Sequence, residues 1–330
     1  MPAVLALKLL AIFATVATGW LAGRTRVFAG AEPARVLSNA AFYVFAPALL
    51  FRTTARIHLG TLPWPALAVF FGPVVGCMLA VYALQRLRAA RAGSTGAGEA
   101  ARPAVRAITS AFGNNVQLGI PMAAALFGEA GLQLHLSVVS LHALVLLSVL
   151  TLLVERDLAR ASSQGRPLAR TLALTARNTV VHPVVLPVLA GLGWNLAGLG
   201  LPGPVDEVLQ LLGSAVVPLC LVVIGLSLGH YGLRGAARPA LALASVKLLL
   251  QPALVLALGT ALGLRGLGLT VVVMASAMPC GTNALLFAQR YRSNEGETTA
   301  AIVLSTLAFA ATAPLWLAVL LQLGHLGPSG

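Results

Sequence analysis

Apolar side chains fill long stretches of the chain, and charged residues gather in the short segments between them. A run of roughly 17 to 25 apolar residues can cross a bilayer as an α-helix. Ten such runs predict an all-α membrane protein with ten transmembrane helices. In chain order they are Ala3–Gly23, Val36–Phe51, Leu62–Leu84, Ala104–Phe127, Leu134–Val154, Thr171–Leu192, Val205–Leu228, Ala240–Leu262, Leu267–Gln289 and Thr298–Leu321.

Two of these runs are interrupted by amide side chains, glycines and prolines. The fourth contains FGNNVQLGIP, residues 112–121, and the ninth contains SAMPCGTNALLF, residues 276–287. Amides cost free energy in hydrocarbon unless their hydrogen bonds are made, and proline removes a helical hydrogen bond. Irregular backbone is tolerated at membrane depth only where it is buried in protein or lines a cavity. We therefore predict that each of these two helices is divided into two half-helices near the middle of the membrane.

The two interrupted runs lie five runs apart, which predicts a 5+5 inverted repeat. A unit with an odd number of spans must have opposite orientations in its two copies. Pro47 and Pro218 in the second and seventh runs support the register. The predicted organisation is a first repeat over residues 1–154, a cytoplasmic linker over 155–170 and a second repeat over 171–330. Interrupted helices at corresponding positions of two repeats are typical of the binding site of a secondary transporter.

Composition and charge agree with a membrane protein and exclude a nucleic-acid partner. Hydrophobic residues make up 58% of the chain and charged residues 9%. The formal net charge is +13, but 17 arginines lie in or beside the odd-numbered loops and only three in the even-numbered loops. By the positive-inside rule, this asymmetry predicts cytoplasmic odd-numbered loops. We expect a multi-pass protein of the cytoplasmic (inner) membrane, surrounded by lipid, with both termini outside.

The interruptions also predict where a ligand binds. The N-terminus of a half-helix offers unpaired N–H groups and about half a positive charge, which suits an anion. Hydrogen bonding between helices is the alternative role for amides at these positions. The predicted substrate-binding residues are Asn114, Asn115, Gln117, Pro121, Pro279, Gly281, Thr282 and Asn283.

Ionisable residues within the runs are few. All nine acidic residues map to loops or to the ends of runs, which disfavours a cation substrate, a sodium site and any other metal site. Lys247 is the deep exception, and Gln251 follows it on the same helix face. Two roles remain open for this pair: capping a helix end, or acting in the anion path or in coupling. His142 and His182 are interpreted as core groups.

The sequence gives little support for catalysis. The segment GLSLG, residues 225–229, matches the G-x-S-x-G pattern of hydrolases, but it ends an apolar helix and has no acidic residue nearby. The chain also lacks the H-E-x-x-H and phosphate-cradling motifs. We therefore predict a protein that is not an enzyme and uses no cofactor. The expected function is secondary transport of a small organic anion by alternating access. A passive anion channel or a solute sensor with a transporter fold is the alternative.

Three segments carry a family resemblance: GNNVQLGIPMAAALFG, VVPLCLVVIGLSL and MPCGTNALLFAQRY. They resemble the auxin efflux carrier family (AEC/PIN type), in the bacterial branch similar to malonate and malate permeases. The resemblance implies a fold similar to that of bile-acid symporters, in which helices four and nine cross at their prolines. It also implies a transport domain of helices 3–5 and 8–10, a scaffold of helices 1, 2, 6 and 7 that often dimerises, and a small carboxylate substrate. The sequence departs from the family at Asn115, where threonine is common, and at Gln117, where an apolar residue is usual.

Overall fold

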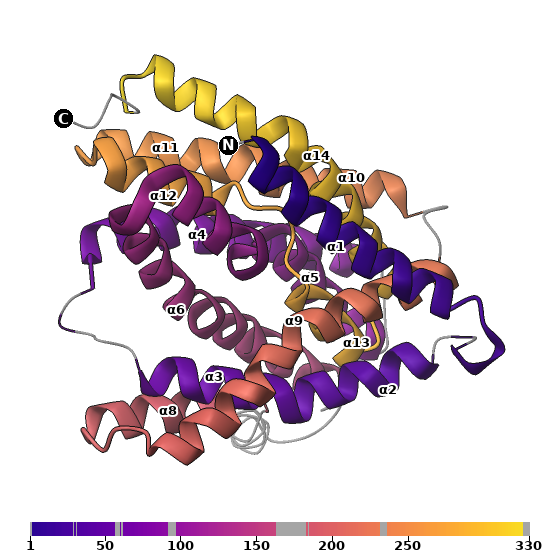
Figure 1. The fold of residues 1–330 in the computed structure, drawn as a ribbon. Coiled ribbons are helices and arrows are strands. Elements are labelled where there is room, and N and C mark those ends of the chain that lie inside the picture. The colour runs from indigo at the N-terminus through magenta and orange to yellow at the C-terminus, as the bar shows by residue number, and fades with distance from the viewer. Residues whose placement is uncertain are drawn as a thin grey trace.

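The computed structural model describes residues 2–28, 30, 32–56, 60, 62–91, 97–162, 183, 185–231 and 236–325. In these ranges the regular structure is helical apart from one isolated β-bridge (Figure 1). Among the described residues, six helical segments are long and apolar enough to cross a membrane, consistent with the predicted all-α membrane protein. The helices are α1 (Pro2–Ala22), α2 (Glu32–Ala40), α3 (Ala46–Ala55), α4 (Trp64–Arg91), α5 (Ala97–Ala111), α6 (Ile120–Ser162), α8 (Val185–Leu196), α9 (Gly203–Tyr231), α10 (Ala237–Ser245), α11 (Gln251–Ala261), α12 (Gly266–Ser276), α13 (Asn283–Arg290) and α14 (Glu295–Gln322), with the short 3-10 helix η1 (Arg26–Phe28).

The predicted runs coincide with helices wherever the structure describes them. The second run belongs to one continuous helical segment, Glu32–Ala55, and the fourth and ninth are interrupted as predicted. The sixth run, Thr171–Leu192, is helical from Val185 onward, and before that only residue 183 is described. The number of membrane-spanning helices and their repeat therefore remain predictions.

In the described part of the chain, three turns of π-helix widen the helices, and each ends two residues before a proline. They are η2 (Ala41–Phe45), η4 (Asn115–Gly119) and η5 (Val246–Leu250), followed by Pro47, Pro121 and Pro252. Proline has no N–H group, and its ring clashes with the carbonyl four residues earlier, so widening the preceding turn relieves the clash. Before Pro252, that carbonyl belongs to Leu248 and accepts a 2.8 Å hydrogen bond from the Trp316 indole.

A glycine separates the fourth predicted run from the fifth. Gly128 has φ 62° and ψ −160°, which are not helical angles, so α6 is two helices joined at a sharp kink. This conformation is accessible to glycine at little cost because it has no Cβ. The kink folds the short segment Ile120–Phe127 away from the axis of the long segment that follows.

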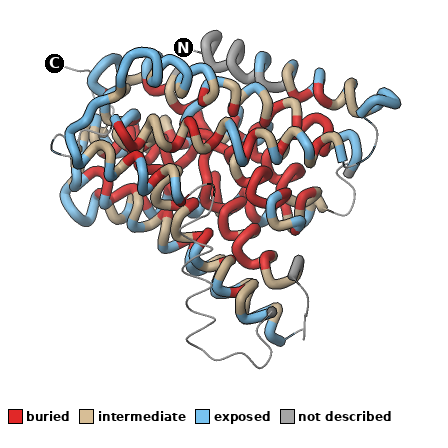
Figure 2. Tube along the Cα trace, turned by 90° about the horizontal axis from the view of Figure 1, so that it is seen from below, coloured by how far each residue is buried: buried red, intermediate tan, exposed pale blue. Residues whose placement is uncertain are grey.

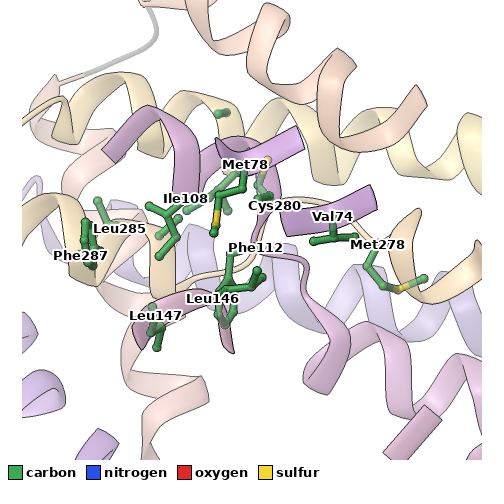
Figure 3. Packing of buried hydrophobic residues seen from close by; sticks show 14 of the residues in the cluster. Val74, Met78, Ile108, Phe112, Leu146, Leu147, Met278, Cys280, Leu285 and Phe287 are labelled. Atoms are coloured by element: carbon green, nitrogen blue, oxygen red, sulfur yellow. The ribbon is translucent and has the colours of Figure 1, made fainter. Parts of the chain in front are cut away.

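The helices form two groups that meet along the middle of the protein. In the first group, α1 packs along α9, and α3 lies beside α8 and α9 (Figure 1). In the second group, α4 packs against α5 and α11, and α10 packs against α14. This group also includes α6, which packs against α5 and α12, and α13, which packs against α14 and α5. Buried residues concentrate in the centre of the molecule (Figure 2). Phe112 and Cys280 lie there among the buried side chains of Met78, Ile108 and Leu146 (Figure 3).

Candidate functional site

The two helix interruptions contact each other directly. The backbone N–H of Asn114 donates to the carbonyl of Pro279 at 2.8 Å, and the N–H of Gly281 donates to the carbonyl of Phe112 at 2.7 Å. These bonds form an antiparallel bridge centred on Gly113 and Cys280. The chain therefore passes through the two interruptions in opposite directions. The pairing satisfies backbone groups that the broken helices leave free.

A cavity of about 360 Å³ lies beside this crossing. Its wall includes residues of both helix groups, with α3 and α9 on one side and the crossing, α6 and α13 on the other. The lining residues are Phe42, Ala46, Leu49, Leu50, Arg52, Thr53, Thr54, Phe112, Gly113, Asn115, Val116, Ile120, Leu136, Val139, Ser140, His142, Ala143, Leu144, Leu147, Val216, Asn283, Leu286 and Phe287.

The N-termini of both second half-helices reach this cavity. Asn115 and Val116 begin η4, and Asn283 begins α13. The first N–H groups of a helix have no partner within the helix and carry partial positive charge. Each break thus directs a helix N-terminus toward the same space. This is the arrangement expected for a site that holds an anion.

Among the residues that line the cavity, the charged one is an arginine, Arg52. Arg52, near the end of α3, donates to Asp206 of α9 at 2.8 Å and to the Gln210 side chain at 2.8 Å. Arg56 also approaches Asp206, at 3.5 Å. None of the lining residues is an aspartate or a glutamate. The wall therefore combines basic and helix N-terminal groups with no acidic side chain.

The structure separates the predicted site residues into three sets. Asn115 and Asn283 line the cavity. Asn114, Pro279, Gly281 and Thr282 are buried in or beside the crossing, outside the cavity wall. The side chains of Gln117 and Pro121 lie outside the described residues. Of the two neighbouring asparagines at the first interruption, Asn115 lies in the cavity wall and Asn114 does not.

Lys247 and Gln251 donate hydrogen bonds to the C-terminal ends of the first half-helices, α12 and α5. Lys247 on η5 donates to the carbonyl of Ser276, the last residue of α12. Gln251 donates to the carbonyl of Ser110, in the last turn of α5, at 3.0 Å. Both side chains are fully buried, and neither lines the cavity. Because a helix C-terminus carries partial negative charge, a lysine there is electrostatically favourable.

Two histidines of α6 contact the first residues after the break. The Nε2 of His135 lies 2.8 Å from the carbonyl oxygen of Asn115, so this nitrogen donates. The Nε2 of His142 lies 3.3 Å from the Asn115 amide nitrogen and 3.5 Å from the backbone nitrogen of Gly113. The sequence predicts His142 to be a core group, and nothing in it alone distinguishes His135. The available signal was their spacing, since residues seven apart share one helix face. His182 lies outside the described residues.

Several carboxylates are paired away from the cavity. Arg106 makes two 2.8 Å bonds to Glu297, joining α5 to α14. The phenol of Tyr291 donates to Glu155 at 3.0 Å. Burial and the Glu155 carboxylate raise the pKa of Tyr291, which keeps the phenol protonated as a donor.

Comparison with known proteins identifies the class to which this fold and site belong. Residues 4–317 match the family model described as "Membrane transport protein", and the chain belongs to that family, which includes the auxin efflux carriers. An uncharacterized transporter of Methanothermobacter thermautotrophicus is 26% identical over 88% of this chain and 90% of its own length. The uncharacterized transporter YfdV of Escherichia coli K12 is 32% identical over 42% of this chain and 44% of its own. A protein of Rhizobium meliloti, named as a proposed malonate transporter, is 26% identical over 47% of this chain and 48% of its own.

Proposed function

We propose that this membrane transport protein carries a small organic anion, a mono- or dicarboxylate, by alternating access around the crossing. One observation carries the proposal. The N-termini of two half-helices, at Asn115 and Asn283, line a single cavity whose wall has no carboxylate. Because Arg52 in that wall is already paired with Asp206, the positive potential comes from the helix N-termini. Such a wall attracts an anion and disfavours a cation. The fold of ten helices in two inverted five-helix repeats is part of this proposal, and the antiparallel crossing supports it.

The size and lining of the cavity support a small substrate with one or two charged groups. A volume of about 360 Å³ lies at the lower end of the ligand-pocket range of about 300–1,000 Å³. Beyond the polar groups, the wall is apolar and includes Phe42, Leu136 and Phe287. A carboxylate with a short hydrocarbon body matches both parts of the wall. The name of the Rhizobium meliloti relative supports a carboxylate as well.

Contacts between the two helix groups support alternating access. At the end of the molecule expected to be cytoplasmic, Gln289 of α13 donates to Ser227 of α9 at 3.1 Å. Nearby, Arg35 of α2 donates to Glu295 of α14 at 3.2 Å. The proposed scaffold comprises α1, α2, α3, α8 and α9, and the other helices form the moving body. These contacts would hold the cytoplasmic side closed and would break when the body moves.

Counterflow in proteoliposomes tests the proposal against its alternatives. Vesicles loaded with unlabelled malonate, malate, isobutyrate or phenylacetate are given the same compound in labelled form. A carrier accumulates label transiently and saturably. The reason is that unlabelled substrate inside the vesicle occupies the site on each outward step and so keeps the entered label from leaving. Flux that does not saturate would indicate a passive channel, and binding without flux would indicate a sensor. Failure of every carboxylate to bind would overturn the proposed substrate class.

A further inference from the structure

His142 contacts two hydrogen-bond donors beside the cavity. Its Nε2 lies 3.5 Å from the backbone nitrogen of Gly113 and 3.3 Å from the amide nitrogen of Asn115. An imidazole nitrogen accepts from these two N–H groups only when it carries no proton. The three residues all line the cavity. In the neutral state, therefore, His142 occupies two donors that face the proposed anion site.

The Asn115 amide has a second arrangement available. Its side chain is buried, with 2% of its surface exposed, and its Oδ1 has no hydrogen-bond donor among the described residues. A buried acceptor without a donor costs free energy. If a proton is added to Nε2 of His142, rotation of the amide brings Oδ1 to accept that proton. The same rotation turns the Asn115 N–H groups away from His142, and the Gly113 N–H loses its acceptor.

We propose that His142 is the proton-binding residue of this transporter and that one proton binds together with the anion. The inference rests on the proposed function and specifies its coupling ion. Protonation at Nε2 releases the backbone N–H of Gly113, and a carboxylate in the cavity accepts a hydrogen bond from it. Anion release reverses the sequence: the donors return to Nε2 as its proton leaves to solvent.

The charges around His142 favour joint binding of proton and anion. Lys247 approaches Gly113 from η5, and a Cβ built on Gly113 would lie 3.3 Å from the lysine Nζ. A second positive charge on His142 is therefore repelled unless an anion offsets it. The other ionisable groups on the elements that pack around His142 already have partners or are thiols. His135 is bonded to the Asn115 carbonyl, and the thiols are those of Cys77 and Cys280. The arginines are paired with carboxylates: Arg52 and Arg56 with Asp206, Arg86 with Asp157, and Arg106 with Glu297.

Linkage makes the coupling measurable without transport. If the anion strengthens proton binding, the proton strengthens anion binding by the same factor. The apparent affinity for the anion should then fall by up to about tenfold per pH unit over the range in which the complex is protonated and the free protein is not. At lower pH, where the free protein is already protonated, the affinity should not depend on pH.

Titration calorimetry of the purified full-length protein tests this inference. Malonate and phenylacetate serve as probes, each in two buffers that differ in heat of ionisation. The difference in observed heat gives the number of protons taken up per anion bound. We expect uptake that approaches one proton over the pH range in which the affinity falls most steeply. This measurement needs only the wild-type protein, so it does not depend on how a variant folds.

Variants assign the proton to a residue. His142→Gln keeps a polar side chain but cannot bind a proton, so uptake should fall to near zero and the pH dependence of affinity should flatten. His135→Gln is the matched control, because it removes a buried histidine of the same helix that donates to Asn115, and uptake should persist. Anion binding without proton uptake in wild type, or full uptake in His142→Gln, would overturn the inference and leave the proposed function intact. Failure of both probes to bind would overturn the two together.

Discussion

The backbone N–H of Asn114 donates to the carbonyl of Pro279 across the crossing of the two interrupted helices, at 2.8 Å. The two residues are far apart in sequence, and each belongs to a segment that cannot complete its own helix. Pairing one interruption with the other satisfies both backbones in the interior of the protein. The half-helices are thereby fixed relative to one another, so a displacement at one interruption is transmitted to the other.

The close approach at the crossing predicts that Gly281→Ala destabilises the protein. A Cβ at this position would lie 2.8 Å from Cδ1 of Phe112 and 2.9 Å from the carbonyl oxygen of Gly113. Backbone would have to shift, which typically costs about 1–3 kcal/mol. Thermal unfolding in detergent should show a lower midpoint, together with weaker anion binding because the half-helix N-termini move. Gly76→Ala is the matched control, since a Cβ there meets nothing within 4 Å. Equal stability of the two variants would contradict a tightly packed crossing.

The sequence predicted the helical class and both interruptions because their signals are local. Long apolar runs specify helices in a membrane, and amides with glycine and proline specify where a helix cannot continue. It did not specify which asparagine faces the cavity. The π-turn η4 changes the angular register of residues 115–119, and a regular helical periodicity does not describe that turn. The sequence nevertheless marks the position of each of the three π-turns, because a proline stands two residues after each turn.

The role of Lys247 could not be decided from sequence because its bonding partner comes from another part of the chain. Depth within an apolar run identifies a costly charge. Whether that charge meets a carboxylate, a substrate or a helix end depends on packing between distant segments. Here, Ser276 and Ser110 offer carbonyls at two helix ends that meet at the crossing, and η5 lies against both.

Lys247→Met should impair stability and turnover more than anion affinity. The substitution leaves the buried carbonyl of Ser276 without this donor, at a cost of about 1–3 kcal/mol. It also removes a positive charge beside a helix C-terminus. Thermal unfolding, binding and counterflow should be measured on the same preparations. Gln251→Met is the comparison, because it removes a neutral cap from the other half-helix. A large loss of affinity in Lys247→Met with unchanged stability would show that Lys247 contacts the anion instead.

Transport should not require sodium. Sites that bind sodium use oxygen ligands, which commonly include a carboxylate. None of the residues that line the cavity is acidic. Counterflow of malonate and phenylacetate should proceed at the same rate when sodium is replaced by choline. A rate that collapses in choline and recovers when sodium is restored would reveal a cation site.

The arginine asymmetry predicts the orientation of the protein in the membrane. A cysteine replacing Ala90, at the end of α4, should react with an impermeant maleimide only from the cytoplasmic side. A cysteine replacing Leu199, which follows α8 and is 62% exposed, should react only from outside. The native cysteines at positions 77, 220 and 280 are buried and should give little background. The reverse labelling pattern at both sites would invert the topology.

Asn115→Ala and Asn283→Ala should each weaken binding of a carboxylate. Both side chains lie in the cavity wall at a half-helix N-terminus, where an amide N–H can donate to a charged oxygen. A hydrogen bond to a charged group contributes about 1.5–3 kcal/mol, so affinity should fall by about 10- to 150-fold. Asn114→Ala should have a smaller effect on affinity, because Asn114 is buried outside the wall and contributes its backbone to the crossing. Titration calorimetry with malonate and phenylacetate on monodisperse preparations gives the three values. If Asn115→Ala and Asn283→Ala bind like the wild type while Asn114→Ala does not, the anion is held on the opposite side of the crossing from this cavity.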